Sequence, residues 1–511
     1  MALNLPAQVD PSRSQLKLTL DTSFVAQLIG TLSYLIDYPY GCVEQTMSRL
    51  LPALMVADLN KSMGVSDPVL DKKIERVVKK GIKRILGFQH SDGGWGWWKQ
   101  DETDPFMTAY ALYGLVRAQQ YGQKIDADVI SRGKEALEKL IPIDNKLQAT
   151  QGPVHGMLKY NDTLAFIIYV DSLLSGKAKL PPVGDPAFTS VLSQSYLALA
   201  AQVKGKAEIL QQYTANLERN VVCQNGLCHF SMGDPQGYGD VEATAWALQA
   251  LIKGGSTNQI LKDQIVAWLI AQRKGGMWRQ TRETAATLYA LAEYARTLPP
   301  GAKGVKANVS LNGAELEKIN VASPHFVRRF TQAKFNEGNN DLGLENLIDH
   351  SLFYQTDLTF FSKQEDLGAV SNGLKVSREY VRLSVLDFTS KTYKVSPLKG
   401  PLKPGEIVGV RIVVQNDEDI DYVLIADPLP SGFEVVDGIR FDDKAEYFAE
   451  METHDDLVAL FSTYLPKGVH SFDYALRPEL QGDFHVMPTQ VEEMYRPEVN
   501  ASGPENKLQV Q

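Results

Sequence analysis

The sequence has no surplus of basic residues, no long apolar run and no leader segment. Its formal net charge is −9, which argues against nucleic acid as a partner because phosphate backbones attract basic surfaces. No stretch approaches the roughly 20 apolar residues of a membrane span. The start, Met1 to Asn4, shows no charged segment followed by an apolar one, so no signal peptide is visible.

Cysteine is also scarce, with three in 511 residues. Cys223 and Cys228 enclose a turn-forming Gln-Asn-Gly-Leu insert, and a small-loop disulfide there would fit an oxidising compartment. Two reduced thiols beside a turn are the alternative. A zinc site is a weaker interpretation, because His229 follows Cys228 but no fourth ligand is evident. We expect no metal and no cofactor.

The third cysteine lies in the run Tyr38-Pro39-Tyr40-Gly41-Cys42-Val43-Glu44-Gln45. Cys42 and Gln45 are three residues apart, so on a helical turn their side chains face the same way and can touch. A sulfur placed there can attack the Gln side-chain carbonyl, expel ammonia and leave an internal thioester. Gly41 permits a sharp turn just before it. The alternative is an inert, packed cysteine at a helix start.

Helical spacing dominates from about Ser23 to Leu298, for example in Phe106–Ala118 and Ala243–Ile252. Glycine-rich aromatic turns recur within it, and each precedes a Thr-Ala pair that we expect to open a helix. The turns cover residues 88–95, 226–230 and 271–278, and the pairs are Thr108-Ala109, Thr244-Ala245 and Thr284-Ala285. Recurrence of one such unit predicts a repeat architecture whose members need neighbours to bury their faces. For Trp95, Trp97 and Trp98 we expect ordinary turn packing.

Strand patterns flank the helical region, and the chain is long enough for about three domains. Residues 305–311 alternate and Asn312-Gly313 is typical of a hairpin turn. The early alternating run at residues 16–20 would pair with these later strands if the helical region is an insertion into one sheet. Beyond residue 372, short strands separated by turn signals predict a β-sandwich.

The run from Tyr38 to Gln45 resembles the C-x-E-Q thioester signature of the alpha-2-macroglobulin and complement family, in its bacterial form. The resemblance covers nearly the whole chain and implies a multidomain α plus β fold. We expect the N-terminal strand of a CUB-like domain in residues 1–22 and a helical α/α toroid thioester domain in 23–300. The remainder of the CUB-like β domain is expected in 301–371 and a C-terminal macroglobulin-like β-sandwich in 372–511.

The resemblance implies a broad-spectrum protease inhibitor and not an enzyme. Its single-use thioester would trap attacking proteases covalently, by acyl transfer to their Lys amines. It also implies that this chain is a C-terminal fragment of a longer exported protein in the periplasm, whose upstream macroglobulin and bait domains would be partners.

The resemblance further implies roles for residues around the thioester. Tyr38 and Tyr40 locally, with Met494 and Tyr495 from the C-terminal region, would shield the bond from water. Their alternative role is ordinary core packing. Glu44, the acid of the signature, would either assist the loss of ammonia or hold the turn.

Some complement members carry a His that forms an acyl-imidazole intermediate. His155 falls roughly where that residue does, but its neighbours do not align with the family pattern. We therefore expect His155 to be exposed or packed in a turn, and we expect amines to be the favoured targets.

An enzyme on the same toroid is the second hypothesis, because paired carboxylates can run glycosidase or lyase chemistry. The candidate acids are Asp101, Glu102, Asp104, Asp234, Asp240 and Glu242.

Overall fold

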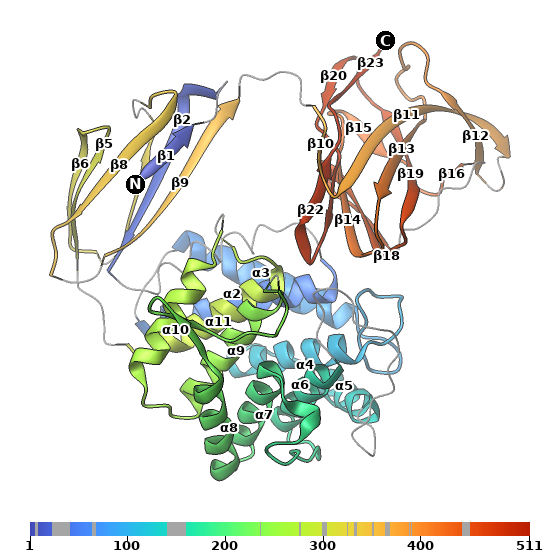
Figure 1. Cartoon of the computed structure of the whole chain (residues 1–511). Coiled ribbons are helices and arrows are strands. Elements are labelled where there is room, and N and C mark those ends of the chain that lie inside the picture. Colours follow the sequence, from blue (N-terminus) through green and yellow to red (C-terminus); the bar gives the residue numbers. More distant parts are fainter. Residues whose placement is uncertain are drawn as a thin grey trace. The chain divides into compact units, whose positions relative to one another are not determined.

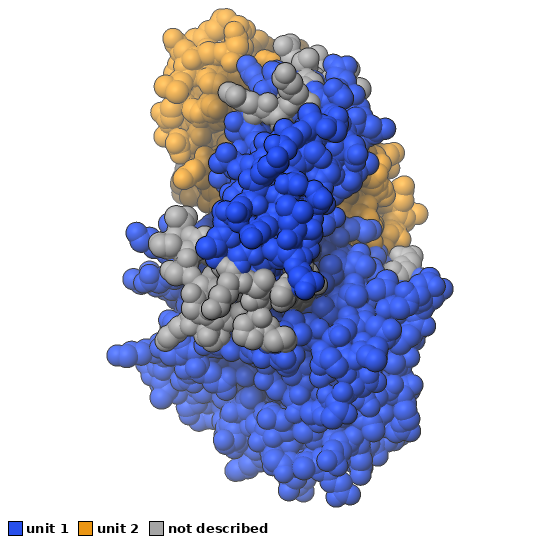
Figure 2. All heavy atoms as spheres, turned by 90° about the vertical axis from the view of Figure 1, so that its left-hand side faces the viewer, with its two compact units in different colours: residues 1–153, 157–363 blue, residues 154–156, 364–511 orange. Residues whose placement is uncertain are grey.

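The computed structural model describes residues 1–5, 9–22, 41–63, 68–140, 160–235, 237–274, 277–298, 304–323, 325–331, 335–349, 352–362, 368–387, 389, 391–441 and 450–511. The chain divides into two units, which Figure 2 colours separately. Unit 1 comprises residues 1–153 and 157–363, and unit 2 comprises residues 154–156 and 364–511.

Inner helices of unit 1 pack side by side in a closed ring, in which α11 returns to α2 (Figure 1). In ring order, the inner helices among the described residues are α2 (Val43–Met63), α4 (Pro105–Gln120), α6 (Tyr160–Leu173), α7 (Val191–Val203), α9 (Asp240–Lys253) and α11 (Thr281–Ala295). Outer helices pack on them: α3 (Pro68–Gly87), α5 (Ala127–Leu140), α8 (Ala207–Asn220) and α10 (Gln259–Ala271). This arrangement confirms the predicted α/α toroid.

Residue patterning explains which helices are inside. Every residue of α11 is buried, Arg282 and Glu283 included, so this helix has neighbours on all sides. In α5 only Gly133, Ala136 and Leu137 are buried, which is the single stripe of an outer helix. A short 3₁₀ helix, η1 (Pro186–Phe188), precedes α7.

The recurring aromatic turns are built by one repeated interaction. The Thr108 hydroxyl accepts from the Trp95 N–H and donates to the Trp95 carbonyl, both at 3.0 Å. Thr244 does the same with Phe230, and Thr284 with Trp278. The sequence analysis expected the Thr-Ala pairs to open their helices, and this expectation is wrong. The helices begin three or four residues earlier, because the hydroxyl must reach back to the turn from inside the helix.

Strands from both ends of unit 1 share sheets, which places the helical region as an insertion between them. β2 (Val9–Asp21) pairs with β7 (His325–Phe330) and β9 (Phe353–Ser362), and β1 (Ala2–Leu5) pairs with β8 (Gly338–Asn346). β5 (Val305–Leu311) pairs with β8 and with β6 (Ala314–Val321). Asn312 and Gly313 connect β5 to β6 with φ of 52° and 78°, as the Asn-Gly turn requires.

Unit 2 contains two six-stranded sheets that share one apolar core. The first sheet, in order, holds β10 (Val370–Asn372), β22 (Arg496–Ser502), β21 (Gln490–Glu493), β14 (Ile420–Pro428), β18 (Leu457–Leu465) and β17 (Glu450–Thr453). The second holds β15 (Phe433–Val435), β19 (Gly468–Pro478), β13 (Val408–Asn416), β11 (Leu374–Asp387), β12 (Thr392–Pro397) and β16 (Arg440–Phe441). β20 (Gly482–Val486) pairs with β23 (Asn506–Val510). The predicted sandwich is present, while the exact domain boundaries stay predictions.

A buried ion pair joins the two sheets of unit 2. Arg378 of β11 donates to Asp427 of β14 at 2.7 Å, and their side chains are 1% and 0% exposed. Tyr474 and Thr489 also donate to the Asp427 carboxylate. A buried charge that loses its partner is strongly unfavourable, so this cluster fixes how the sheets are paired.

We expect Asp427→Ala to lower the free energy of unfolding of unit 2 by about 3–5 kcal/mol, because it leaves the Arg378 guanidinium buried without its counter-ion. Urea denaturation measures the change. The control is Glu479→Ala, which removes the exposed pair with Arg477 and should change the value by about 1 kcal/mol or less. Equal effects of the two substitutions would contradict the prediction.

Candidate functional site

Cys42 and Gln45 meet at the first turn of the inner helix α2. The Thr46 N–H donates to the Cys42 carbonyl at 2.9 Å, which makes Cys42 the N-cap residue and Gln45 the third helical residue. The Gln45 N–H donates to Cys42 Sγ at 3.4 Å, and the Cys42 N–H donates to Gln45 Oε1 at 3.3 Å. This reciprocal exchange is that of a capping box, with a thiol in place of the usual hydroxyl.

The exchange places a nucleophile beside an acyl group in a site closed to solvent. Cys42 and Gln45 are each 1% exposed. Since each side chain bonds to the backbone N–H of the other residue, the sulfur and the carboxamide lie on the same side of the turn. This arrangement can transfer the Gln45 acyl group to the Cys42 sulfur with little movement of either side chain.

Neighbouring elements hold the backbone on both sides of Cys42. Arg84 of α3 donates through Nε to the Gly41 carbonyl at 2.6 Å. The Val43 N–H donates to the Trp97 carbonyl at 2.9 Å. A Cβ at Gly41 would lie 2.6 Å from the Arg84 Cζ, so a larger residue there would displace the Arg84 side chain from this contact.

Glu44 faces the interior of the ring. Its carboxylate is fully buried and accepts from the Ser48 hydroxyl at 2.6 Å and from the Thr281 hydroxyl at 3.0 Å. Burial raises the pKa of the Glu44 carboxyl, although the Ser48 hydrogen bond and the Arg282 charge act in the opposite direction. Glu44 therefore ties α2 to its neighbour in the ring, α11, and these contacts favour its role in holding the turn.

A second set of buried charges lies at the same end of α9 and α11. Arg282 pairs with Glu242 at 2.9 Å, with side chains 4% and 3% exposed. Both line a cavity of about 20 Å³ inside the ring, which is room for about one water. Burial and the nearby Glu242 charge raise the pKa of Glu283 to about 8.

Four of the remaining acids of the enzyme hypothesis serve as hydrogen-bond acceptors for the backbone, and the fifth, Glu102, is exposed to solvent. Asp101 accepts from the Trp97 and Trp98 N–H groups, Asp104 is the N-cap of α4, Asp234 accepts from the Tyr238 N–H, and Asp240 accepts from the Met232 N–H. The structure therefore does not gather the candidate acids around a substrate-sized cavity in the described part of the ring.

Cys223 and Cys228 form a disulfide across the hairpin of β3 (Val222–Gln224) and β4 (Leu227–His229). His229 stacks on Trp268, with ring centroids 4.6 Å apart. Within the described ranges, no group of three or more His, Cys, Asp or Glu residues could hold a metal ion.

The expected shield cannot be assembled from the described residues. Tyr38, Tyr40 and His155 lie outside them. Met494 and Tyr495 belong to unit 2, where Tyr495 is buried against Tyr422 with ring centroids 5.3 Å apart. Shielding by these residues stays a prediction.

Sequence reasoning missed Arg84, Thr281 and the Trp97 backbone. The aromatic turn at residues 88–95 was visible as a repeated unit, and Trp97 just after it was expected only to pack in the turn. Its contact with Val43 joins residues far apart along the chain, and no spacing in the sequence encodes it.

Two family profiles match the chain. Residues 14–141 and 188–294 match the A-macroglobulin TED domain, and residues 373–498 match the bacterial alpha-2-macroglobulin MG10 domain.

Curated relatives carry the same family name. The chain is 23% identical to an alpha-2-macroglobulin homolog from a Nostoc species over 100% of this chain and 27% of that protein. It is 26% identical to Escherichia coli alpha-2-macroglobulin over 91% of this chain and 28% of the relative. A Thermotoga maritima alpha-2-macroglobulin is 39% identical over 27% of this chain and 8% of its own length. The chain thus spans less than a third of each of these relatives.

Solved structures show the same fold. Salmonella alpha-2-macroglobulin reacted with methylamine matches 100% of this chain and 33% of its own, with a TM-score of 0.74 and 21% identity. Native E. coli alpha-2-macroglobulin, from domain MG7 to the C-terminus, matches 100% of this chain and 80% of its own, with a TM-score of 0.73 and 21% identity.

We expect Glu283→Gln to alter the pH dependence of stability. A carboxyl whose pKa rises from 4.5 to about 8 on folding binds a proton in the folded state, so stability falls as pH rises through that window. Gln resembles the protonated form, so the variant should gain on the wild type by up to about 1.4 kcal/mol per pH unit there.

Urea denaturation at pH 5, 7 and 9 measures this difference. Glu315→Gln is the control, because the Glu315 side chain is 60% exposed. A difference between Glu283→Gln and the wild type that is constant across these pH values would contradict the prediction.

Proposed function

Because the chain belongs to the bacterial alpha-2-macroglobulin family, we propose that it carries an internal thioester between Cys42 and Gln45 and uses it to bind attacking proteases covalently. The observation that supports this most directly is the reciprocal contact of the two side chains in a buried turn. As the relatives are much longer, the activity of the whole protein belongs to this proposal too.

Formation of the bond replaces an amide by a thioester. The Cys42 sulfur attacks the Gln45 side-chain carbonyl carbon, the carbon–nitrogen bond breaks, and the thiol proton leaves with the nitrogen as ammonia. The Cys42 and Gln45 N–H groups are placed to polarise the carbonyl oxygen and the sulfur, respectively, at 3.3 and 3.4 Å. Burial keeps hydroxide from hydrolysing the product.

Capture is a second acyl transfer. A protease Lys amine attacks the thioester carbonyl carbon, the carbon–sulfur bond breaks, and the sulfur takes up the amine proton to become a thiol again. The product is a stable amide between Gln45 and the protease. The reaction consumes the bond, so it is stoichiometric and shows no turnover.

Further parts of the proposal concern the setting of this chemistry. Upstream macroglobulin and bait domains would bring the protease to the chain. The Cys223–Cys228 disulfide is compatible with an oxidising compartment such as the periplasm. None of the described helices is both long and apolar enough to cross a membrane. For the toroid enzyme, we find no specific observation in the described residues in its favour.

Freshly purified protein should have a mass lower than its sequence by one ammonia, and Cys42 should resist alkylation. Methylamine, the reagent named for the Salmonella structure, should release the Cys42 thiol and add to Gln45. Intact mass and thiol titration with peptide mapping measure this.

Cys42→Ala and Gln45→Ala should each abolish the ammonia loss. The double variant Cys223→Ser/Cys228→Ser should keep it, since the disulfide lies elsewhere in the ring. If Cys42 in untreated protein is readily alkylated and the mass shows no ammonia loss, the proposal is wrong.

Amines should be preferred over hydroxyl groups as acceptors, because we expect no participation of His155. Transfer of the Gln45 acyl group to labelled methylamine and to labelled glycerol gives the ratio. His155→Ala should leave that ratio unchanged, whereas a selective loss of glycerol transfer would show that His155 forms an acyl-imidazole.

A further inference from the structure

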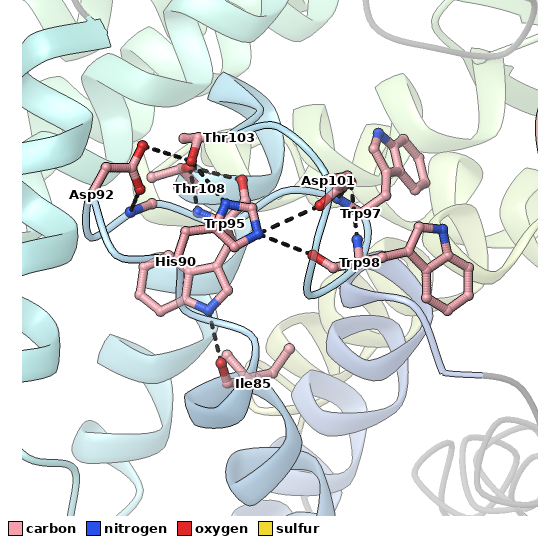
Figure 3. A network of polar contacts seen from close by, with 10 residues as sticks. Ile85, His90, Asp92, Trp95, Trp97, Trp98, Asp101, Thr103 and Thr108 are labelled. Atoms are coloured by element: carbon pink, nitrogen blue, oxygen red, sulfur yellow. Dashed lines mark hydrogen bonds and ion pairs between the residues drawn. The ribbon is translucent and has the colours of Figure 1, made fainter. Parts of the chain in front are cut away.

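The loop at residues 88–104 connects α3 to α4 and packs against the start of α2. We call it the clamp loop. Its Trp95, Trp97 and Trp98 side chains are all buried. The Trp97 and Trp98 N–H groups donate to Asp101 Oδ2 at 2.6 and 3.0 Å (Figure 3). The peptide groups that meet α2 are therefore held from within the loop.

His90 lies at the centre of this network, between two acidic side chains (Figure 3). Its Nε2 is 3.1 Å from the Trp98 carbonyl and 3.5 Å from Asp101 Oδ1. Its Nδ1 is 2.9 Å from the Thr103 hydroxyl oxygen. The His90 ring thus joins the two ends of the clamp loop.

Both ring nitrogens of His90 therefore have a partner inside the clamp loop. The Trp98 carbonyl can only accept, so Nε2 carries a hydrogen and donates to it. Thr103 in turn donates to Asp92 Oδ2 at 2.8 Å, which extends the network from His90 to the first part of the loop.

Several charged side chains surround this network. Burial acts to raise the pKa of the Asp92 carboxyl, but hydrogen bonds from the Gly94 N–H and the Thr103 hydroxyl lower it overall, so Asp92 is ionised. Around the clamp loop, Arg132 of α5 donates to Gln89 and Asp104 caps α4. Lys99 and Glu102 of the clamp loop are exposed to solvent.

The network reaches the thioester residues in one step. The Trp97 carbonyl accepts from the Val43 N–H at 2.9 Å, and Trp97 is next to the residue whose carbonyl His90 binds. On the other side of Cys42, Arg84 holds the Gly41 carbonyl and lies over the Phe88 ring, which begins the clamp loop. The backbone flanking Cys42 is therefore fixed by the clamp loop and the end of α3.

We propose that His90 is a positioning residue for the Cys42–Gln45 thioester: it sets the clamp loop, whose Trp97 carbonyl holds the backbone just after Cys42. The inference rests on the proposed function. Without the His90 ring, the Trp98 carbonyl and the Thr103 hydroxyl lose the partner that joins them. The clamp loop then loosens, the turn that carries Cys42 and Gln45 moves more, and water reaches the bond more often.

The test compares His90→Gln and Asp101→Asn with the wild type and with His229→Gln, a matched control in the turn before α9. Hydrogen exchange of the segment around Val43 measures how firmly the clamp loop holds the start of α2. The rate at which the Cys42 thiol appears in water measures hydrolysis of the thioester. We expect both to rise about tenfold in His90→Gln, the order of one hydrogen bond, and not in His229→Gln.

Exchange in α7, elsewhere in the ring, separates positioning of the Cys42 turn from general support of the fold. In His90→Gln, exchange should rise around Val43 and stay at the wild-type rate in α7. An equal rise in both segments, or no rise around Val43, would overturn the inference.

Measuring exchange also in a Cys42→Ala background, which forms no thioester, distinguishes the two proposals. If the wild type lacks the ammonia loss, the proposed function fails, and with it the role of His90 toward the bond. If the ammonia loss is present but His90→Gln leaves the exchange rate around Val43 unchanged in both backgrounds, the inference alone fails.

Discussion

The exchange of hydrogen bonds between Cys42 and Gln45 caps the first turn of α2, and the proposed thioester chemistry depends on that cap staying closed. A short turn at a helix start frays readily unless its unpaired N–H groups find acceptors. Here a thiol and a carboxamide satisfy two of them. The same contacts that stabilise the helix end bring the sulfur and the carboxamide together, so local stability and the proposed reactivity have one origin.

The elements packed around α2 provide further contacts that hold the capped turn in place. Glu44 bonds to Thr281 on α11, Arg84 comes from α3, and the Trp97 carbonyl comes from the loop that leads into α4. Three other elements thus form hydrogen bonds with the start of α2. Their convergence follows from ring closure, because a helix can be contacted on all sides only when its neighbours pack side by side around it.

The repeated bond between a threonine and an aromatic turn explains how such different segments reach equivalent positions. Thr108, Thr244 and Thr284 each bind both backbone groups of the aromatic residue before their helix. The turn before α4 then differs from the others by adding His90 and Asp101. The interaction common to the three turns has therefore been extended next to Cys42 and Gln45.

Local patterns in the sequence determined much of the fold: the Asn312-Gly313 turn and the strand rhythm after residue 372 need only neighbouring residues to specify them. The spacing of Cys42 and Gln45 likewise predicted their contact, because three residues on a helix bring side chains together. Tertiary structure alone decided that Glu44 faces Thr281, that Arg84 holds Gly41 and that Arg378 meets Asp427. The two residues of each pair are distant along the chain, and many polar residues could form the same hydrogen bond or ion pair. Only the packing of the helices or of the two sheets therefore determines which residue becomes the partner.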